Sequence, residues 1–174
     1  MKFELLKSEI TYKGRAFTVR QDLLRTPSGD TTNFDIIEHI GSIVLIPIDE
    51  KGQMYFVKQY RHAAGLDLLE LPAGTLEPGE PPEEAAAREI REETGMAADH
   101  LKEIGSFYLA PGYSSELMHV FLATGLTHNP LAPDADEYLS VEKIPARKAI
   151  RLAESGEMQD AKTLAALLLA KKYL

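Results

Sequence analysis

Apolar and polar residues alternate loosely through the first part of the chain, in the period-two pattern of half-buried strands. Residues 3–25 and Thr31 to His39 follow this pattern on either side of the turn Pro27–Asp30, so we expect strands in both. Ile43 to Ile46 is a near-continuous apolar run, typical of a strand buried on both faces, and Met54 to Val57 is its expected hairpin partner. The N-terminal part of the chain is therefore expected to be β-structure.

The remainder of the chain predicts helices between shorter strands. Residues 63–79 are rich in Gly and Pro and should form a loop with short extended pieces. A helix should run from Pro81 to about Thr94, because Pro suits a first turn and Gly95 suits the position after the last one. Further strands are expected at Phe107–Leu109 and Leu117–Ala123, and further helices at Ile144–Glu154 and Asp160–Tyr173. Strands interleaved with helices indicate an α/β or α+β domain.

Composition narrows the classes of function. The 174 residues fit one domain with at most a small appendage, and the net charge of −8 argues against nucleic acid or an anionic membrane as partner. There is no cysteine, which excludes disulfides, thiolate catalysis and Cys-based zinc sites. The longest apolar run, Leu164 to Ala170, is too short to cross a bilayer, and the N-terminus lacks a signal-peptide core, so we expect a cytoplasmic protein. The histidines show no metal-ligand spacing and are expected to be structural or solvent-facing.

Three carboxylates share one face of the expected helix. Glu89 lies three and four residues before Glu92 and Glu93, a spacing at which like charges repel unless a cation neutralises them. Carboxylates without a neighbouring imidazole or thiol favour a hard ion, Mg²⁺ or Mn²⁺. Arg88, four residues before Glu92, could hold that side chain by a charge-assisted hydrogen bond. A solvated glutamate-rich face is the alternative interpretation.

The spacing from Gly74 to Met96 decides between these two interpretations. It matches the signature of the Nudix hydrolases in full, and Ile90 and Met96 occupy the two positions that require a bulky apolar residue. The chain therefore resembles this family, more loosely over nearly its whole length. The fixed positions are Gly74, Glu80, Arg88, Glu89, Glu92, Glu93 and Gly95.

The resemblance implies an α/β/α sandwich on a mixed β-sheet, with the signature forming a loop, a helix and a loop. It also implies hydrolysis of a nucleoside diphosphate linked to another moiety, with a divalent cation. The implied metal ligands are Glu89, Glu93 and the backbone carbonyl of Ala73, with Glu92 as a further ligand or the base. Gly74 would let its loop pass close to the metal.

Several further segments resemble bacterial ADP-ribose pyrophosphatases. The loop Leu109–Glu116 implies substrate contacts from Pro111, Gly112 and Glu116, although Ser115 stands where Asp is common. A rigid turn between two strands is the alternative for the Pro–Gly pair.

Upstream, Arg61 is followed by the segment Glu70–Gly74, and its guanidinium would neutralise a phosphate; a surface salt bridge is the alternative. The segment Asp160–Thr163 is also typical of this group, and we interpret it as mainly structural, a cap followed by an amphipathic helix.

The same resemblance divides the chain into an N-terminal β extension, residues 1–40, and a Nudix domain, residues 41–174. The extension is expected to exchange across a homodimer and help to form the base pocket. There Phe34 could stack on adenine and Asp35 accept from its exocyclic amine, although many relatives have Arg at position 34. A core phenylalanine is the alternative. In the acidic stretch 133–138, Glu137 is a candidate general base, positioned when its loop closes, or simply part of an acidic surface loop.

These features predict Mg²⁺-dependent hydrolysis of ADP-ribose, or a close ADP-sugar, to AMP and a sugar phosphate. A GDP-mannose-type pyrophosphatase is the nearest alternative, because it shares the signature and differs chiefly in the base pocket. A non-catalytic domain that senses a nucleotide would usually lose signature glutamates, which this chain keeps. An enzyme acting on oxidised nucleoside triphosphates leaves residues 1–40 and the Pro111 loop unexplained.

Overall fold

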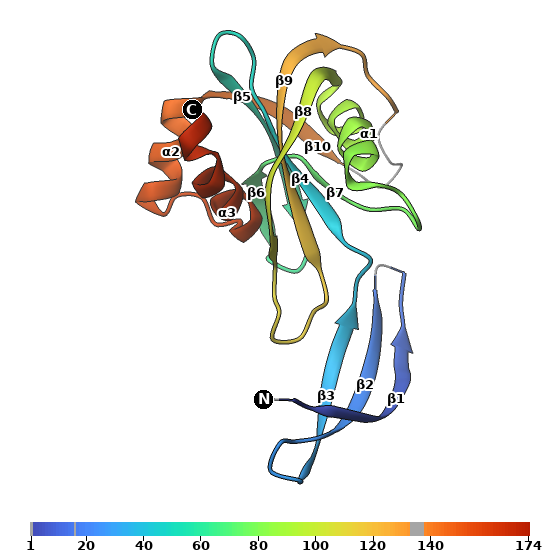
Figure 1. Ribbon diagram of the computed structural model, residues 1–174. Coiled ribbons are helices and arrows are strands. Elements are labelled where there is room, and N and C mark those ends of the chain that lie inside the picture. Colours follow the sequence, from blue (N-terminus) through green and yellow to red (C-terminus); the bar gives the residue numbers. More distant parts are fainter. Residues whose placement is uncertain (1, 16, 133–137) are drawn as a thin grey trace. The chain divides into compact units, whose positions relative to one another are not determined.

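The computed structural model describes residues 2–15, 17–132 and 138–174 (Figure 1). The chain forms two compact units. The first comprises Met1–Gly41 with Tyr108–Leu117, and the second comprises Ser42–Phe107 with Met118–Leu174. Each unit is described by itself.

The first unit is an antiparallel sheet in the order β1-β2-β3, formed by β1 (Glu4–Lys13), β2 (Thr18–Arg25) and β3 (Thr31–Glu38). The strands expected in residues 3–25 and from Thr31 are thus confirmed. All residues of β1 are exposed, whereas most of β2 is half-buried. The loop 109–116 lies along the end of β3, where the Ile37 amide donates to the Tyr113 carbonyl at 2.7 Å.

The second unit contains two sheets. The larger has the order β7-β4-β9-β8, and it is mixed because β4 pairs parallel with β9 and antiparallel with β7. The smaller has the order β10-β5-β6 and is antiparallel. The strands are β4 (Ser42–Pro47), β5 (Gln53–Arg61), β6 (Leu66–Glu70), β7 (Ala73–Thr75), β8 (Met96–Tyr108), β9 (Leu117–His128) and β10 (Leu139–Pro145).

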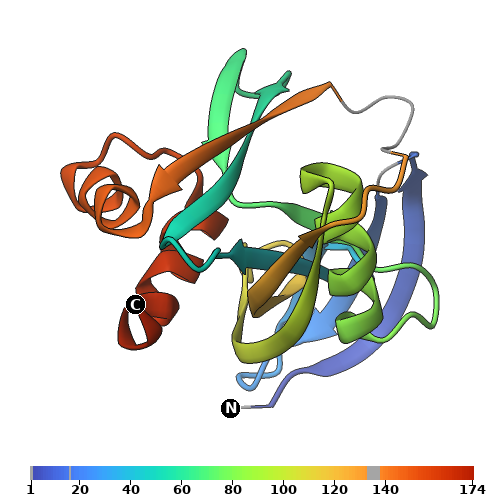
Figure 2. The same ribbon diagram turned by 90° about the horizontal axis from the view of Figure 1, so that it is seen from above.

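Helices cover both faces of β4. Its residues Val44 and Ile46 belong to a buried cluster with Leu167 of α3, while Ile43 belongs to a second cluster with Ile90 of α1. Figure 2 shows α1 on one side of this strand and α2 and α3 on the other. The helices are α1 (Pro82–Thr94), α2 (Ala146–Ser155) and α3 (Ala161–Ala170), and a 3₁₀ turn (Lys171–Tyr173) follows α3. The arrangement confirms the expected α/β/α sandwich on a mixed sheet.

The sequence pattern misplaced two elements. The strand expected at Phe107–Leu109 begins at Met96 as β8, and the helix expected from Ile144 begins at Ala146, because residues 139–145 form β10. Apolar and polar residues alternate little in β8 and β10. These strands form because β8 pairs with β9 and β10 pairs with β5, which is a tertiary effect that the local sequence pattern does not predict. No helix among the described residues is long and apolar enough to span a membrane.

Candidate active site

The helix α1 presents the carboxylate face as its sequence predicts. It starts after the extended residue Pro81, carries two acidic residues in its first turn, and ends at Gly95, whose φ of 72° is left-handed. The Gly95 amide donates to the Arg91 carbonyl at 3.2 Å. Ala85, Ala86 and Ile90 lie beside Glu89 and Glu93 on the buried side of the helix and pack in the core, which fixes the rotation of the helix.

Arg88 is the centre of a cluster of three carboxylates. Its Nε and Nη2 each donate to Glu80 at 3.0 Å, and its Nη1 donates to Glu89 at 2.7 Å and to Glu92 at 2.9 Å. The expected bond from Arg88 to Glu92 is therefore present. The hydrogen bonds from Arg88 hold the pKa of Glu80 below its ordinary value, and the hydrogen bonds that Arg88 donates to Glu80 and Glu89 raise the pKa of Arg88. One guanidinium among three carboxylates leaves an excess of negative charge.

Glu89 and Glu93 are buried and lie against the short strand β7, which precedes the helix in the chain. A Cβ added to Gly74 would lie 1.9 Å from the Cδ and Oε1 atoms of Glu89, so only glycine admits this carboxylate. One residue earlier, the Ala73 amide donates to Glu93 Oε2 at 2.9 Å. The prediction that Gly74 lets its loop pass close to the metal stays a prediction, and the group that the structure places at Gly74 is the Glu89 carboxylate.

The donor set of this face fits a hard divalent cation in kind. Glu89, Glu92 and Glu93 offer carboxylate oxygens, and burial of like charges at this spacing favours a neutralising ion. In the described residues, however, no three metal-ligating side chains converge on one point. Glu89 and Glu92 instead share the Arg88 guanidinium, so a cation would compete with Arg88 for these two carboxylates.

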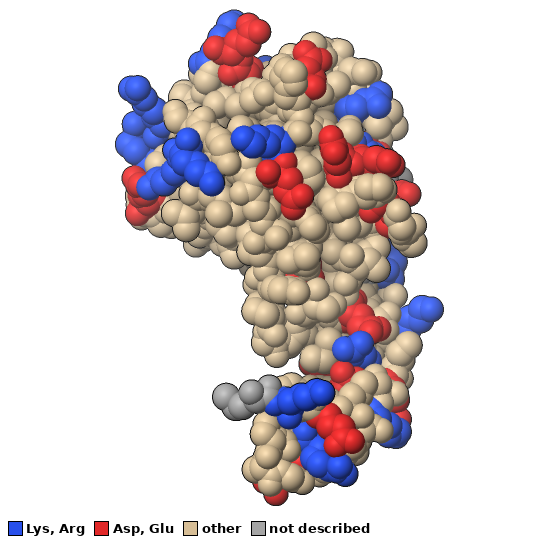
Figure 3. Space-filling view, viewed as in Figure 1, with Lys and Arg blue, Asp and Glu red and all other residues tan. Residues whose placement is uncertain are grey.

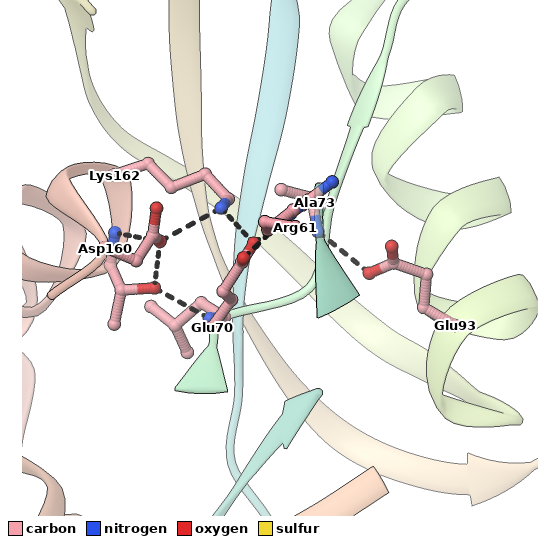
Figure 4. Close-up of polar contacts among 8 residues, drawn as sticks. Arg61, Glu70, Ala73, Glu93, Asp160 and Lys162 are labelled. Atoms are coloured by element: carbon pink, nitrogen blue, oxygen red, sulfur yellow. Dashed lines mark hydrogen bonds and ion pairs between the residues drawn. The ribbon is translucent and has the colours of Figure 1, made fainter. Parts of the chain in front are cut away.

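A second polar cluster has the opposite arrangement, one carboxylate between two cations (Figure 4). The fully buried Glu70 accepts from Arg61 Nε at 2.8 Å and from Arg61 Nη2 at 2.6 Å, and its Oε2 also accepts from Lys162. Lys162 is buried too and pairs with Asp160 at 3.0 Å. Burial raises the pKa of Glu70, but hydrogen bonds from Arg61 and the charge of Lys162 outweigh it, so that pKa lies below its ordinary value.

The same cluster connects β6 to the first turn of α3. The Leu71 amide donates to Thr163 Oγ1 at 2.8 Å, and Asp160 caps the helix by accepting from the Thr163 amide at 3.0 Å. The expected cap at Asp160 is thereby confirmed. Together with the bond from Ala73 to Glu93, these contacts fix residues 70–73 between α3 and α1, as Figure 4 shows.

Arg61 thus takes part in an ion pair, the alternative left open for it, and its side chain is still 42% exposed. The Nε and Nη2 atoms of Arg61 donate to Glu70, whereas Nη1 of Arg61 has no hydrogen-bond acceptor among the described residues. The hydrogen bonds to Glu70 raise the pKa of Arg61, and the charges of Glu93 and Asp160 add to the effect. Its role toward a phosphate stays a prediction.

The remaining predicted site residues lie in the first unit or outside the described residues. Phe34 packs edge-on against Phe3, with ring centroids 6.0 Å apart, and Asp35 accepts from Gln21 at 2.9 Å. Pro111, Gly112 and Glu116 lie in the loop that borders β3. Glu137 falls outside the described residues. Their roles in binding and catalysis stay predictions.

Sequence reasoning did not connect Glu70 with Lys162. The signal was present, because Glu70 follows the apolar pair Leu68–Leu69 and Lys162 opens a strongly apolar helix. A charge embedded in such a segment is rarely buried without a partner of opposite sign.

Surface charge differs between the two helical layers. Figure 3 shows basic side chains gathered over the region of α2 and acidic ones over the side of α1. The layer that carries the carboxylate face is therefore also acidic at its surface.

Comparison with known proteins identifies the family and the fold. The model of the NUDIX domain matches residues 38–167. An ADP-ribose pyrophosphatase of Mycobacterium tuberculosis is 37% identical over 169 residues, which cover 95% of this chain and 82% of the relative. A GDP-mannose pyrophosphatase of an Enterobacter species is 28% identical over 183 residues, covering 94% of this chain and 92% of the relative.

Among solved structures, a crystal structure of an ADP compounds hydrolase superposes with a TM-score of 0.90 at 26% sequence identity, covering 100% of this chain and 95% of that chain. The matched region contains the complete signature from Gly74 to Met96, and its three helical carboxylates, Glu89, Glu92 and Glu93, lie on α1. The chain therefore belongs to the Nudix family of hydrolases.

Proposed function

We propose that the protein hydrolyses ADP-ribose, or a closely related ADP-sugar, to AMP and a sugar phosphate, with Mg²⁺ as cofactor. The observation that carries this proposal is the presence in one unit of an anionic cluster at α1 and a cationic group, Arg61, on the neighbouring strand β5. The relative named for ADP-ribose is also more similar, at 37% identity, than the one named for GDP-mannose, at 28%.

Glu89, Glu92 and Glu93, with the carbonyl of Ala73, are the residues that would hold the cation. When bound, a divalent cation lowers the pKa of a coordinated water and screens the charge of the diphosphate. An all-oxygen donor set favours Mg²⁺, and Mn²⁺ accepts the same ligands.

The protein side chains then divide the remaining tasks. Arg61 neutralises one phosphate through the part of its guanidinium that Glu70 does not use. A water oxygen forms a bond to one phosphorus, the bond from that phosphorus to the bridging oxygen breaks, and the bridging oxygen leaves with the other phosphate. Glu92 or Glu137 accepts the proton of the attacking water.

The nucleoside contacts would come from the first unit. We assign base stacking to Phe34, a hydrogen bond from the adenine amine to Asp35, and further contacts to Pro111, Gly112 and Glu116. Phe34 is 38% exposed and Asp35 is exposed as well, so both side chains can reach a ligand.

We also propose a homodimer formed through the first unit. Its sheet exposes several large apolar side chains, which monomeric proteins rarely gather in one place. The most exposed among them are Leu5, Ile10 and Tyr12 of the edge strand β1. Light scattering should give twice the chain mass for the wild type and a shift toward the chain mass for Ile10→Asp. A monomeric wild type would contradict this assembly.

The substrate is tested by product analysis with Mg²⁺ on ADP-ribose, GDP-mannose, NADH, diadenosine polyphosphates and deoxynucleoside triphosphates. We expect the highest kcat/KM with ADP-ribose, AMP as a product, and loss of turnover when EDTA removes the cation. A preference for GDP-mannose or for triphosphates would overturn the assignment.

A further inference from the structure

The buried lysine at the start of α3 has no part in the function proposed so far. Lys162 is 8% exposed and its ammonium group is held by two carboxylates, Glu70 and Asp160. Burial of an ammonium group is costly unless hydrogen bonds compensate it, and a methionine of similar length would pack there at lower cost. A purely structural reason for a lysine at this position is therefore weak.

Its partner Glu70 is also the carboxylate that holds Arg61. Arg61 Nη2 and Lys162 Nζ bind the same oxygen, Oε2, while Arg61 Nε binds Oε1. Without Lys162, Glu70 and Arg61 would form a neutral pair, and the guanidinium would have little net charge to offer a second anion. With Lys162, the carboxylate is shared between two cations.

Asp160 is the second carboxylate that pairs with Lys162. Its carboxylate lies at the N-terminus of α3, where it accepts from the Thr163 amide and where the helix dipole compensates part of its charge. Arg61 and Lys162 thus balance the carboxylates of Glu70 and Asp160, and without Lys162 these two carboxylates would outnumber the Arg61 guanidinium.

We propose that Lys162 is a positioning residue for substrate binding, and that it acts through Glu70. It fixes Glu70, which orients Arg61, and it leaves the Arg61 guanidinium with positive charge toward a phosphate of the diphosphate substrate. This inference rests on the proposed role of Arg61 in binding that phosphate.

The first test is steady-state kinetics of Lys162→Met with the best substrate of the panel above. We expect KM to rise about tenfold, the effect of losing one charge-assisted contact, while kcat changes little. Lys171→Met, on the exposed turn after α3, is the matched control and should leave both constants unchanged. An unchanged KM in a folded Lys162→Met protein would overturn the proposal, whatever its melting temperature.

The second test asks whether Lys162 acts through Arg61. In the Arg61→Met background, Lys162→Met should raise KM no further, because the group that it positions is absent. Equal increases of KM in both backgrounds would contradict the chain of contacts from Lys162 to Arg61.

A third variant keeps the proposal testable if Lys162→Met does not fold. Asp160→Asn keeps an oxygen to cap Thr163 but removes a negative charge, so KM should fall or stay constant. A rise of KM as large as that expected for Lys162→Met would refute the electrostatic argument. Because the assays use whichever substrate the wild type cleaves best, failure of the proposed function appears in the wild type, and failure of this inference appears only in the variants.

Discussion

The two charged clusters of the second unit are built in opposite ways. At α1, one guanidinium lies among three carboxylates, those of Glu80, Glu89 and Glu92. At the junction of β6 and α3, one carboxylate, Glu70, lies between Arg61 and Lys162. The first cluster has surplus negative charge, whereas the second balances two cations, Arg61 and Lys162, against the carboxylates of Glu70 and Asp160. In a protein with a net charge of −8, this difference supports our proposal that a cation and an anionic substrate bind at separate places.

Burial strengthens the electrostatic interactions of both clusters. Glu89, Glu93, Glu70 and Lys162 are all at least nine-tenths buried, so their charges are screened less by water than surface ion pairs. The residues 70–73 connect the clusters, because Glu70 is held from α3 and Ala73 from Glu93. A change in either cluster should therefore affect catalysis, but through different constants.

The largest effect should come from Glu93→Gln. The glutamine can still accept from the Ala73 amide, so the fold should remain, while the loss of a carboxylate should lower kcat by at least about a hundredfold. Glu84→Gln, an exposed carboxylate in the first turn of the same helix, is the control and should retain activity. Near-normal turnover of Glu93→Gln would show that the Glu93 carboxylate of α1 is not required for catalysis.

The next largest effect should appear in the stability of Glu70→Gln. This change leaves Arg61 without its counter-ion and Lys162 with Asp160 alone, and we expect a loss of about 2–3 kcal/mol at neutral pH, less than for fully buried pairs because the Arg61 side chain is 42% exposed.

The pH dependence of that loss has a defined sign. The pKa of Glu70 lies below its ordinary value in the folded state, so its stabilising contribution is present above that ordinary value and is lost as the pH falls through the folded-state pKa. Denaturant melts should therefore show a wide gap between wild type and variant at pH 7 that closes at acidic pH. A gap that is constant with pH would argue against an ionised Glu70.

A smaller loss of stability is expected for Gly74→Ala. The new Cβ would meet the Glu89 carboxylate at 1.9 Å, and overpacking of this kind costs about 1–3 kcal/mol. Activity should fall as well, because Glu89 must move. Gly112→Ala, with no atom within 4 Å of its added Cβ, should leave the melting temperature unchanged. Equal melting temperatures of Gly74→Ala and wild type would contradict the tight contact between Gly74 and the Glu89 carboxylate.

The smallest effect should follow Glu80→Gln. It removes one of three carboxylates around Arg88 and should lower stability by roughly 1 kcal/mol, since charged hydrogen bonds at a partly exposed site contribute modestly. Chemical denaturation measures it. A loss of stability as large as that of Glu70→Gln would mean that Glu89 and Glu92 do not compensate Arg88 for the missing charge, contrary to the geometry.

The sequence predicted the regions whose interactions are local. The bounds of α1, its stop at Gly95 and the bond from Arg88 to Glu92 follow from contacts within one helix, and spacing reports these directly. The expected buried strand at Ile43–Ile46 follows from its apolar run. The bond from Lys162 to Glu70 joins residues 92 positions apart, and no local pattern gives their distance. For the same reason β10 and most of β8, which depend on pairing partners, were not predicted.

The central claim is that the carboxylate face of α1, formed by Glu89, Glu92 and Glu93, binds the cation while the cluster at Glu70 serves the anionic substrate. Calorimetric titration of Mg²⁺, without substrate, into wild type, Glu93→Gln and Lys162→Met tests it directly. We expect a binding isotherm for wild type, severe loss of affinity for Glu93→Gln, and wild-type or tighter affinity for Lys162→Met, since that change removes a positive charge. Equal loss of Mg²⁺ affinity in both variants, or undiminished binding to Glu93→Gln, would contradict the claim.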